Sequence, residues 1–380
     1  MDILSYIVDW IVPFVVVFTI LVFVHELGHY WIARRAGVRI ETFAIGFGPE
    51  LFGRRDSHGT RWKVCAIPLG GYVKMFGEQD FESNDADMPM TAEDQAVSFH
   101  HKRLGQRAAI VAAGPLANFA FAIVLLTALF TAVGLPFPLA SVGQIQSGSA
   151  AAEAGFVQGD RILRVNDEDV ASFEDLRSIV RDNPDRALRF EIERGGDTLL
   201  LTATPQAVAA DAAGSDSGAT GKVGLLGVSP DPAQIGYQRL NPFEAVATAS
   251  QRTWDLTTQI LGALGQIITG SRTAEELGGP LRIAQLSGQM AQGGMVSLVF
   301  FMAALSINLG LINLFPVPML DGGHLAFYAV EAVRGRPLNQ KIQEYGFRFG
   351  LVLVLLLMIF ATWNDLVQLQ VVEFFKKLVT

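Results

Sequence analysis

The sequence has little charge and almost no cysteine. Only 17% of its 380 residues are charged and half are hydrophobic, whereas globular proteins average about 25% charged residues. This composition excludes a disordered chain, a nucleic-acid-binding protein and an ordinary soluble enzyme. The single cysteine, Cys65, excludes an internal disulfide framework and a zinc site built from cysteines. The composition therefore indicates an integral membrane protein with a sizeable polar portion.

The chain also lacks blocks of one charge sign, so its net charge of −8 points to no particular partner. What it does contain is four hydrophobic runs, each long enough to cross a membrane. These runs cover residues 11–33, 108–135, 295–320 and 346–363. No Lys or Arg precedes the first run, so we expect a retained span rather than a cleavable signal peptide. The predicted fold class is a polytopic α-helical membrane protein with about four transmembrane helices.

Basic residues next to the spans predict the orientation of the chain. They cluster after span 1, before span 2 and between spans 3 and 4, at Arg34, Arg35, Arg39, Lys102, Arg103, Arg107, Arg334, Arg336 and Lys341. By the positive-inside rule, these loops face the cytoplasm. The long segment 137–294 is exempt from the rule, because long translocated domains cross regardless of charge. We therefore expect both termini and this segment on the outer side.

The segments between the spans predict further domains. Residues 38–75 have the pattern of a β-hairpin around the turn DSHG, and complete an N-terminal membrane core, 1–135. Residues 140–230 predict a small α/β domain with a flexible insertion at 208–221. Residues 242–290 read as a helical segment that either lies on the membrane surface or packs against the neighbouring domain. A C-terminal membrane core, 295–380, follows.

The sequence HELGH, residues 25–29, lies inside the first span. On a helix, His25 and His29 are one turn apart on the same face, so both imidazoles can bind one zinc ion. Glu26 lies beside them and can take a proton from water at the metal. Ionisable residues inside a span are costly and mark functional sites. His25 is 14 residues beyond Ile11, about 21 Å along a helix, so the site lies in the cytoplasmic third of the bilayer.

A catalytic zinc site needs a third protein ligand. Asp321 is the best candidate, because it ends the apolar run of span 3 at the expected depth, and His324 is the alternative. The other histidines, His58, His100 and His101, lie in loops and are expected on the surface. Asn118, about 15 Å into span 2, either reaches the same site or joins helices.

Together these residues resemble the site-2 protease family of intramembrane zinc metalloproteases (peptidase M50), of the regulator-of-sigma-E protease type. The resemblance covers nearly the whole chain. Its segments are FVHELGHYWIARRAGV (23–38), FAIGFGPELF (43–52), IPLGGYVKM (67–75), AAGPLANF (112–119), GGPLRIAQLSG (278–288) and INLGLINLFPVPMLDGGHL (307–325). The paired HExxH and LDGG motifs are its most specific part.

The resemblance implies a site and a cofactor. It makes His25, His29 and Asp321 the ligands of a Zn²⁺ ion and Glu26 the catalytic base. Asn313 and Pro316 match positions near the substrate path, and Asn118 or Asn313 is expected to help stabilise the oxyanion. The hairpin 38–75 resembles a membrane-dipping element that presents the substrate as an added strand.

The resemblance also implies partners and a location. The expected substrates are single-span membrane proteins, such as an anti-sigma factor or signal-peptide remnants, cut within their transmembrane segments. Residues 140–206 look like a PDZ domain, which binds a peptide or chain terminus; the family's best-known members carry two in tandem, whereas one is found here. The implied location is a bacterial inner membrane, with the termini and the PDZ domain in the periplasm. The lipid bilayer is a partner and nucleic acid is not.

Two other classes of function fit parts of the sequence. A zinc transporter needs polar residues on both sides of the metal, and span 1 before His25 offers only Thr19. A membrane-anchored PDZ scaffold needs no catalytic base, and Glu26 is intact. Both alternatives are therefore weaker than the protease.

Overall fold

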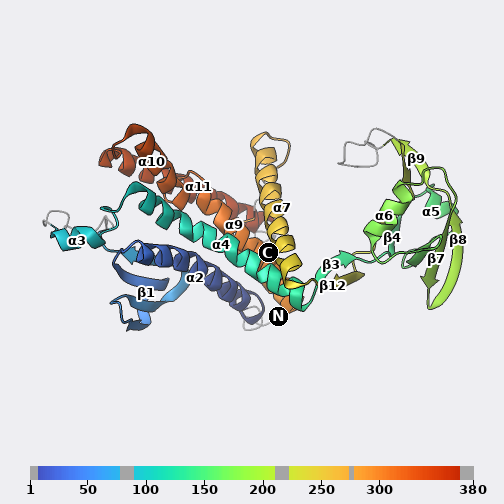
Figure 1. Cartoon of the computed structure of the whole chain (residues 1–380), viewed down its shortest axis with the longest axis horizontal. Coiled ribbons are helices and arrows are strands. Elements are labelled where there is room, and N and C mark those ends of the chain that lie inside the picture. Colours follow the sequence, from blue (N-terminus) through green and yellow to red (C-terminus); the bar gives the residue numbers. More distant parts are fainter. Residues whose placement is uncertain (1–6, 78–89, 210–221, 274–277, 369–380) are drawn as a thin grey trace, which may run out of the picture. The chain divides into compact units, whose positions relative to one another are not determined.

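A computed structural model describes residues 7–77, 90–209, 222–273 and 278–368 (Figure 1). The chain divides into two compact units. The membrane unit comprises Met1–Leu129 and Pro242–Thr380, and the inserted unit comprises Phe130–Asn241. Most of the expected flexible insertion, 210–221, and most of the acidic stretch after the hairpin, 78–89, lie outside the described residues.

Within the described residues, four helices are long and apolar enough to cross a membrane, which confirms the predicted number of spans. The first begins with a π-helical turn, η1 (Ile7–Ile11), and continues as α2 (Val12–Arg35). The others are α4 (Leu104–Ala132), α9 (Met295–Leu314) and α11 (Gln340–Gln368). Figure 1 shows α2, α4, α9 and α11 running lengthwise through the membrane unit.

Three helices differ in extent from the predicted spans. Helix α9 ends at Leu314, not at residue 320, because Phe315 precedes Pro316 and takes an extended conformation with ψ of 143°. Helix α4 ends at Ala132, not at residue 135, and the chain turns at Gly134, which has φ of 127°. Helix α11 is longer than the apolar run 346–363, because its polar first turns are helical as well.

The predicted hairpin is present as β1 (Ile40–Arg55) and β2 (Arg61–Met75), paired antiparallel from Ile40↔Met75 to Arg55↔Arg61. The turn between them is closed by Asp56, whose Oδ1 accepts hydrogen bonds from two backbone N–H groups of the turn. The hairpin packs against α2 through aromatic rings. Phe43 of β1 stacks on Trp62 of β2, with ring centroids 4.3 Å apart, and both rings contact Tyr30 of α2. The hairpin is therefore held against the helix that carries the HELGH sequence.

The described residues of the membrane unit form four further helices: α3 (Ala92–Val97), α7 (Pro242–Ile268), α8 (Pro280–Gln292) and α10 (Asp321–Arg334). Helix α7 occupies most of the helical segment predicted from residue 242. It packs against α9. It buries a stripe of small residues, Ala245, Ala249 and Thr253, and exposes large apolar ones such as Phe243 and Trp254.

The inserted unit contains the α/β pattern predicted from the sequence. Its strands are β3 (Leu135–Pro138), β4 (Val142–Ile145), β5 (Arg161–Val165), β6 (Glu168–Asp169), β7 (Leu188–Arg194), β8 (Asp197–Ala203), β9 (Gln206–Ala209), β10 (Lys222–Leu225), β11 (Val228–Pro230) and β12 (Ile235–Gln238). Strands β6, β5, β7 and β8 form one antiparallel sheet in that order. The remaining strands named above form antiparallel pairs: β4 with β11, β9 with β10, and β3 with β12.

Among the described residues of this unit, two short helices join the strands, α5 (Ala150–Glu153) and α6 (Phe173–Arg181). Helix α6 begins with a capping box, in which Ser172 and Asp175 each accept a hydrogen bond from the other's backbone N–H. The unit also contains a buried ion pair. The carboxylate of Asp160 is fully buried and receives two hydrogen bonds from Arg194, at 2.7 and 2.8 Å.

Candidate metal centre

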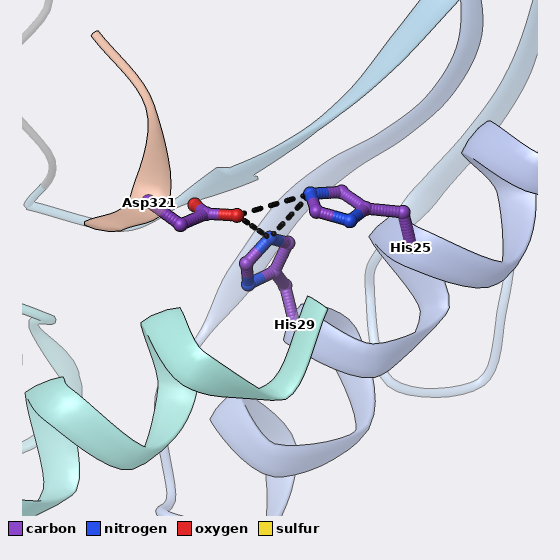
Figure 2. A group of neighbouring side chains, drawn as sticks. All are labelled: His25, His29 and Asp321. Atoms are coloured by element: carbon purple, nitrogen blue, oxygen red, sulfur yellow. Dashed lines mark hydrogen bonds and ion pairs between the residues drawn. The ribbon is translucent and has the colours of Figure 1, made fainter. Parts of the chain in front are cut away.

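Three potential metal ligands meet inside the membrane unit. His25 and His29 come from consecutive turns of α2, and their Nε2 atoms lie 3.2 Å apart. Asp321 is the first residue of α10, and its Oδ2 lies 3.1 Å from Nε2 of His25 and 3.5 Å from Nε2 of His29. Figure 2 shows the three side chains pointing toward one another. Both histidines are buried, and the carboxylate is largely so.

The glycines of the LDGG motif explain how Asp321 reaches this place. After α9 ends, the chain turns through two prolines and begins α10 at Asp321. A Cβ atom added to Gly322 would overlap the backbone carbonyls of Leu314 and Phe315, and one added to Gly323 would overlap Val317. Only glycine lets the first turn of α10 pack this tightly onto the end of α9. This packing directs Asp321 toward α2.

The three residues fit a zinc ion. Their ligand atoms all lie within 4.8 Å of one another. Oδ2 of Asp321 is buried and, within the described residues, accepts no hydrogen bond of acceptable geometry. An unsatisfied buried carboxylate oxygen facing two imidazole nitrogens is costly, and a cation bound by all three groups removes that cost. Two histidines and one carboxylate are a donor set typical of catalytic zinc.

Helix α4 contacts the two imidazole rings on the side opposite Asp321. Nδ1 of His29 donates a hydrogen bond to the backbone carbonyl of Ile110, at 2.9 Å. This bond places the ring proton on Nδ1 and leaves the lone pair of Nε2 facing Asp321, as a metal ligand requires. Nδ1 of His25 lies 3.2 Å from the side-chain amide of Asn118. Each candidate histidine ligand therefore has a partner on α4.

Glu26 faces a cavity of about 290 Å³ that the metal cluster also lines. The hairpin forms part of the wall of this cavity. Val73 of β2 lines the cavity together with Glu26. An added Cβ at Gly71 would lie within 3.3 Å of the Glu26 side chain. Strand β2 therefore runs directly beside Glu26.

The remaining residues predicted for the site differ in whether they line this cavity. Asn313 lines the cavity together with the cluster. Among the described residues that line it, Asn118 does not appear, because it lies behind His25. Pro316 is exposed in the turn that follows α9. His324 lines the cavity, but its ring packs on Phe347 and it is not part of the metal cluster found among the described residues.

The other histidines, His58, His100 and His101, are exposed, as predicted. Sequence reasoning missed several residues of the cavity wall: Tyr72, Val73, Met75, Phe99 and Tyr328. Tyr72, Val73 and Met75 could have been found from the sequence, because they lie in the hairpin segment 67–75 that resembles the family. Nothing local in the sequence indicates Phe99 or Tyr328.

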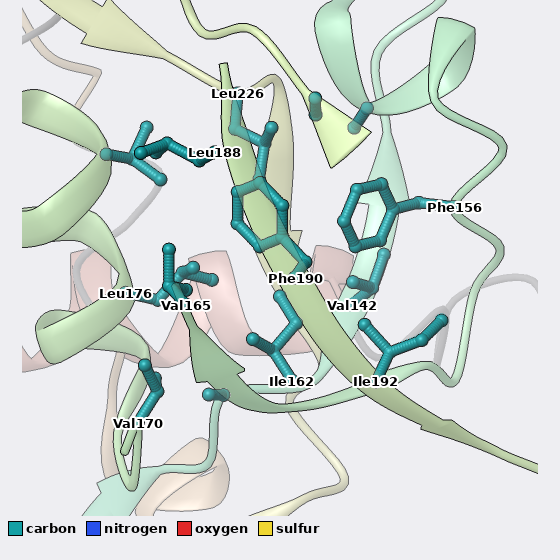
Figure 3. Packing of buried hydrophobic residues seen from close by; sticks show 14 of the residues in the cluster. Val142, Phe156, Ile162, Val165, Val170, Leu176, Leu188, Phe190, Ile192 and Leu226 are labelled. Carbon is teal, nitrogen blue, oxygen red and sulfur yellow. The ribbon is translucent and has the colours of Figure 1, made fainter. Parts of the chain in front are cut away.

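The inserted unit holds a smaller cavity of about 120 Å³ between α6 and the segment from Val223 to Val228. Its apolar lining includes Leu176 and Leu226, which belong to the buried core shown in Figure 3. Two arginines of α6, Arg177 and Arg181, also line it. This groove lies within the domain for which the sequence predicts peptide binding.

A His, His, Asp cluster beside a glutamate, set among apolar helices, defines a metal-dependent hydrolase of the membrane. The family model described as Peptidase family M50 matches residues 13–357. A protein of Agrobacterium fabrum, whose name marks it as a candidate zinc metalloprotease, is 43% identical over 371 residues, covering 96% of this chain and 97% of its own. The chain therefore belongs to peptidase family M50, the site-2 protease family, and is a zinc metalloendopeptidase.

Two further relatives are similar over almost their entire length. Metalloprotease MmpA of Caulobacter vibrioides is 38% identical over 395 residues, which cover 97% of this chain and 98% of the relative. The Regulator of sigma-E protease RseP of Salmonella typhimurium is 33% identical over 450 residues, which cover 94% and 98%. The resemblance identified from the sequence motifs is thus confirmed at the level of the family.

Proposed function

We propose that this protein cuts single-span membrane proteins within their transmembrane segments. The observation that carries the proposal is the cavity that Glu26, the metal cluster and the edge of β2 share. His25 and His29 lie within a helix that is apolar enough to span a membrane. A peptide must lie among apolar helices to reach this cavity. The substrate that suits such surroundings is a transmembrane segment.

We assign the zinc ligands to His25, His29 and Asp321. When bound, the ion acts as a Lewis acid toward water and the peptide carbonyl. The protein's own contribution begins with α4, which fixes the imidazole rings so that Nε2 of both faces the metal position. Asp321 supplies a negative charge that partly offsets that of the cation.

Glu26 is the general base in this proposal. Its carboxylate takes a proton from the attacking water and later gives it to the nitrogen of the leaving peptide fragment. Strand β2 packs against the Glu26 side chain at Gly71 and so limits where the carboxylate can lie. Asn313 also faces the cavity, so its amide is the better placed of the two candidate asparagines to donate a hydrogen bond to the developing oxyanion.

The hairpin is proposed to hold the substrate in an extended form. A helical substrate hides its carbonyl groups, so it must unwind before it can be cut, and its exposed backbone groups then need partners in the membrane. Strands β1 and β2 form a two-stranded sheet, so each has one lateral edge outside that pairing. Adding the substrate as a third strand satisfies its backbone groups. Pro316, just after α9, lies on the route into the cavity in this proposal.

The inserted unit is proposed to be a PDZ domain that binds a peptide or chain terminus in the groove beside α6. In this arrangement the inserted unit and both chain termini lie in the periplasm of a bacterium. The metal site lies in the cytoplasmic third of the inner membrane. The basic end of α2, at Arg34 and Arg35, supports this orientation. The name of one relative, Regulator of sigma-E protease, agrees with an anti-sigma factor as one substrate in this proposal. Signal-peptide remnants are the other class of substrate that we propose.

The experiment compares the wild type with Glu26→Gln on a single-span substrate in detergent, with bound zinc quantified. Glutamine has nearly the same shape but cannot accept the proton, so we expect unchanged zinc and a loss of cleavage of about 10² to 10⁴-fold. Glu344→Gln, at a half-buried glutamate of α11 that pairs with Arg348, is the matched control and should cut normally. Cleavage that survives Glu26→Gln contradicts the proposal and favours a transporter or a scaffold.

A further inference from the structure

Asn118 is a fully buried polar residue on the span α4. Its side-chain nitrogen, as placed, lies 3.2 Å from Nδ1 of His25, while its Oδ1 is buried and lacks a hydrogen-bond partner within the described residues. Its backbone carbonyl accepts a hydrogen bond from Ser306 of α9, at 2.8 Å. Ser306 is buried as well, so Asn118 is anchored from behind.

The chemistry of a histidine ligand determines which way the Asn118 amide points. His25 presents Nε2 to Asp321, so a metal bound at this place uses the lone pair of Nε2. The ring proton must then lie on Nδ1, which becomes a donor and needs an acceptor. An amide nitrogen cannot accept, whereas the amide oxygen can. The oxygen and nitrogen of an amide are assigned from their partners, so Oδ1 belongs on the side that faces His25.

The spacing along α4 supports this role. Ile110, Gly114 and Asn118 are four residues apart, so they follow one another on one face of the helix. Ile110 accepts the hydrogen bond from His29, and a Cβ added to Gly114 would overlap the His29 ring. Asn118, one turn further, meets His25. On this face of α4, Ile110 and Gly114 therefore contact His29, and Asn118 contacts His25.

We propose that Asn118 is a positioning residue for the metal, which accepts a hydrogen bond from Nδ1–H of His25 and thereby keeps Nε2 of His25 available as a ligand. The inference rests on the zinc site of the proposed function. It differs from the oxyanion role considered for this residue, since it acts through His25 and from outside the cavity.

The test measures the zinc dissociation constant by competition with a coloured chelator, on the full chain in detergent. Asn118→Leu keeps the approximate size but removes the acceptor, so we expect zinc binding to weaken about 10 to 100-fold. Asn118→Asp keeps an acceptor and should bind zinc within about threefold of the wild type. The matched control is Thr127→Val, which removes a buried hydroxyl elsewhere on α4 and should leave zinc binding unchanged.

Two results would overturn the inference. If Asn118→Leu binds zinc as tightly as the wild type, His25 does not need the acceptor, and a loss of kcat alone would then assign Asn118 to the oxyanion. If Asn118→Asp binds zinc as weakly as Asn118→Leu, the residue matters only for packing. Zinc affinity is measured without substrate, so the outcome is independent of the Glu26→Gln experiment, which tests the protease itself.

Discussion

The hydroxyl of Tyr30, the residue after His29, donates a hydrogen bond to the carboxylate of Asp56 in the hairpin turn, with 3.2 Å between the oxygen atoms. Arg34, one turn further along α2, donates to the same hydroxyl at 2.8 Å. The indole of Trp62 donates to Asp56 as well, at 3.1 Å. The turn of the hairpin is thus tied to α2 immediately beyond the metal ligands.

Breaking this connection should loosen the hairpin. Asp56→Ala removes the acceptor for several donors, and leaving such groups unsatisfied costs about 1–3 kcal/mol. We expect backbone amides of β1 and β2 to exchange with deuterium at least about fivefold faster than in the wild type. Exchange in α9, away from the hairpin, serves as the internal control. Unchanged exchange throughout the hairpin would show that the aromatic packing alone holds it.

The same carboxylate should make the hairpin sensitive to acid. Burial acts to raise the pKa of Asp56, but hydrogen bonds from Trp62 and from the backbone of His58 and Thr60 outweigh it and hold the pKa below its ordinary value. A carboxyl group with a lowered pKa stabilises the fold above its unfolded-state pKa and loses that effect as the pH falls through the folded-state pKa. Hairpin amide exchange, corrected for intrinsic rates, should therefore accelerate on acidification. Asp56→Asn should flatten this dependence.

Replacing the third ligand should remove the metal. Asp321→Ala eliminates one of three ligand groups, so we expect purified protein to lose most of its bound zinc and its cleavage activity. His324→Ala, three residues away in the same cavity, should retain zinc because His324 is outside the cluster. Metal content measured by atomic spectroscopy separates the two. Zinc lost from His324→Ala and kept by Asp321→Ala would reverse the ligand assignment.

Adding one methyl group at Gly114 should disrupt the site. The Cβ of Gly114→Ala would overlap the ring of His29, and both the backbone of α4 and the histidine would have to move. We expect zinc affinity to fall at least about tenfold, as for loss of an orienting contact. Gly105→Ala, in open space on the same helix, is the control and should behave as the wild type. Normal zinc binding in Gly114→Ala would mean that the two helices separate easily.

The inserted unit should depend on its buried ion pair. Asp160→Ala leaves Arg194 without its bidentate partner. We expect the free energy of unfolding to fall by more than it does for a surface pair, because the Asp160 carboxylate is fully buried although the arginine is one-third exposed. Asp169→Ala, at an exposed carboxylate paired with Arg164, should cost well under 1 kcal/mol. Hydrogen exchange in β5 and β7 of the full chain measures both. Equal effects of the two variants would contradict the importance assigned to burial.

The sequence predicted those features that depend on local spacing. His25 and His29 share a face because they are four residues apart, and the hairpin follows from two strand patterns around a turn. Contacts between distant segments carry no such signal. Asp365, for example, is almost fully buried and accepts hydrogen bonds from backbone N–H groups at the start of α8, including that of Gly279, 86 residues away. Its position near the end of an apolar span was the only indication of a special role.

The role of Asn118 illustrates the same limit. The sequence shows an asparagine inside a span, which fits either a catalytic group or a contact between helices. Only the packing of α4 against α2 shows that it faces the rear of His25. The end of α9 was predictable in principle, because a residue before proline disfavours the helical conformation, but hydrophobicity alone extended the span to residue 320.

The pairing of β3 with β12 brings the two ends of the inserted unit together, with Leu135 opposite Gln238. The chain therefore enters and leaves this unit through neighbouring strands, although about a hundred residues separate them. A domain whose two ends lie this close can be inserted or replaced as a unit, because the rest of the chain has to provide only two neighbouring connections. The size of the insertion at this point can thus change without altering the length or order of the helices that hold the metal ligands.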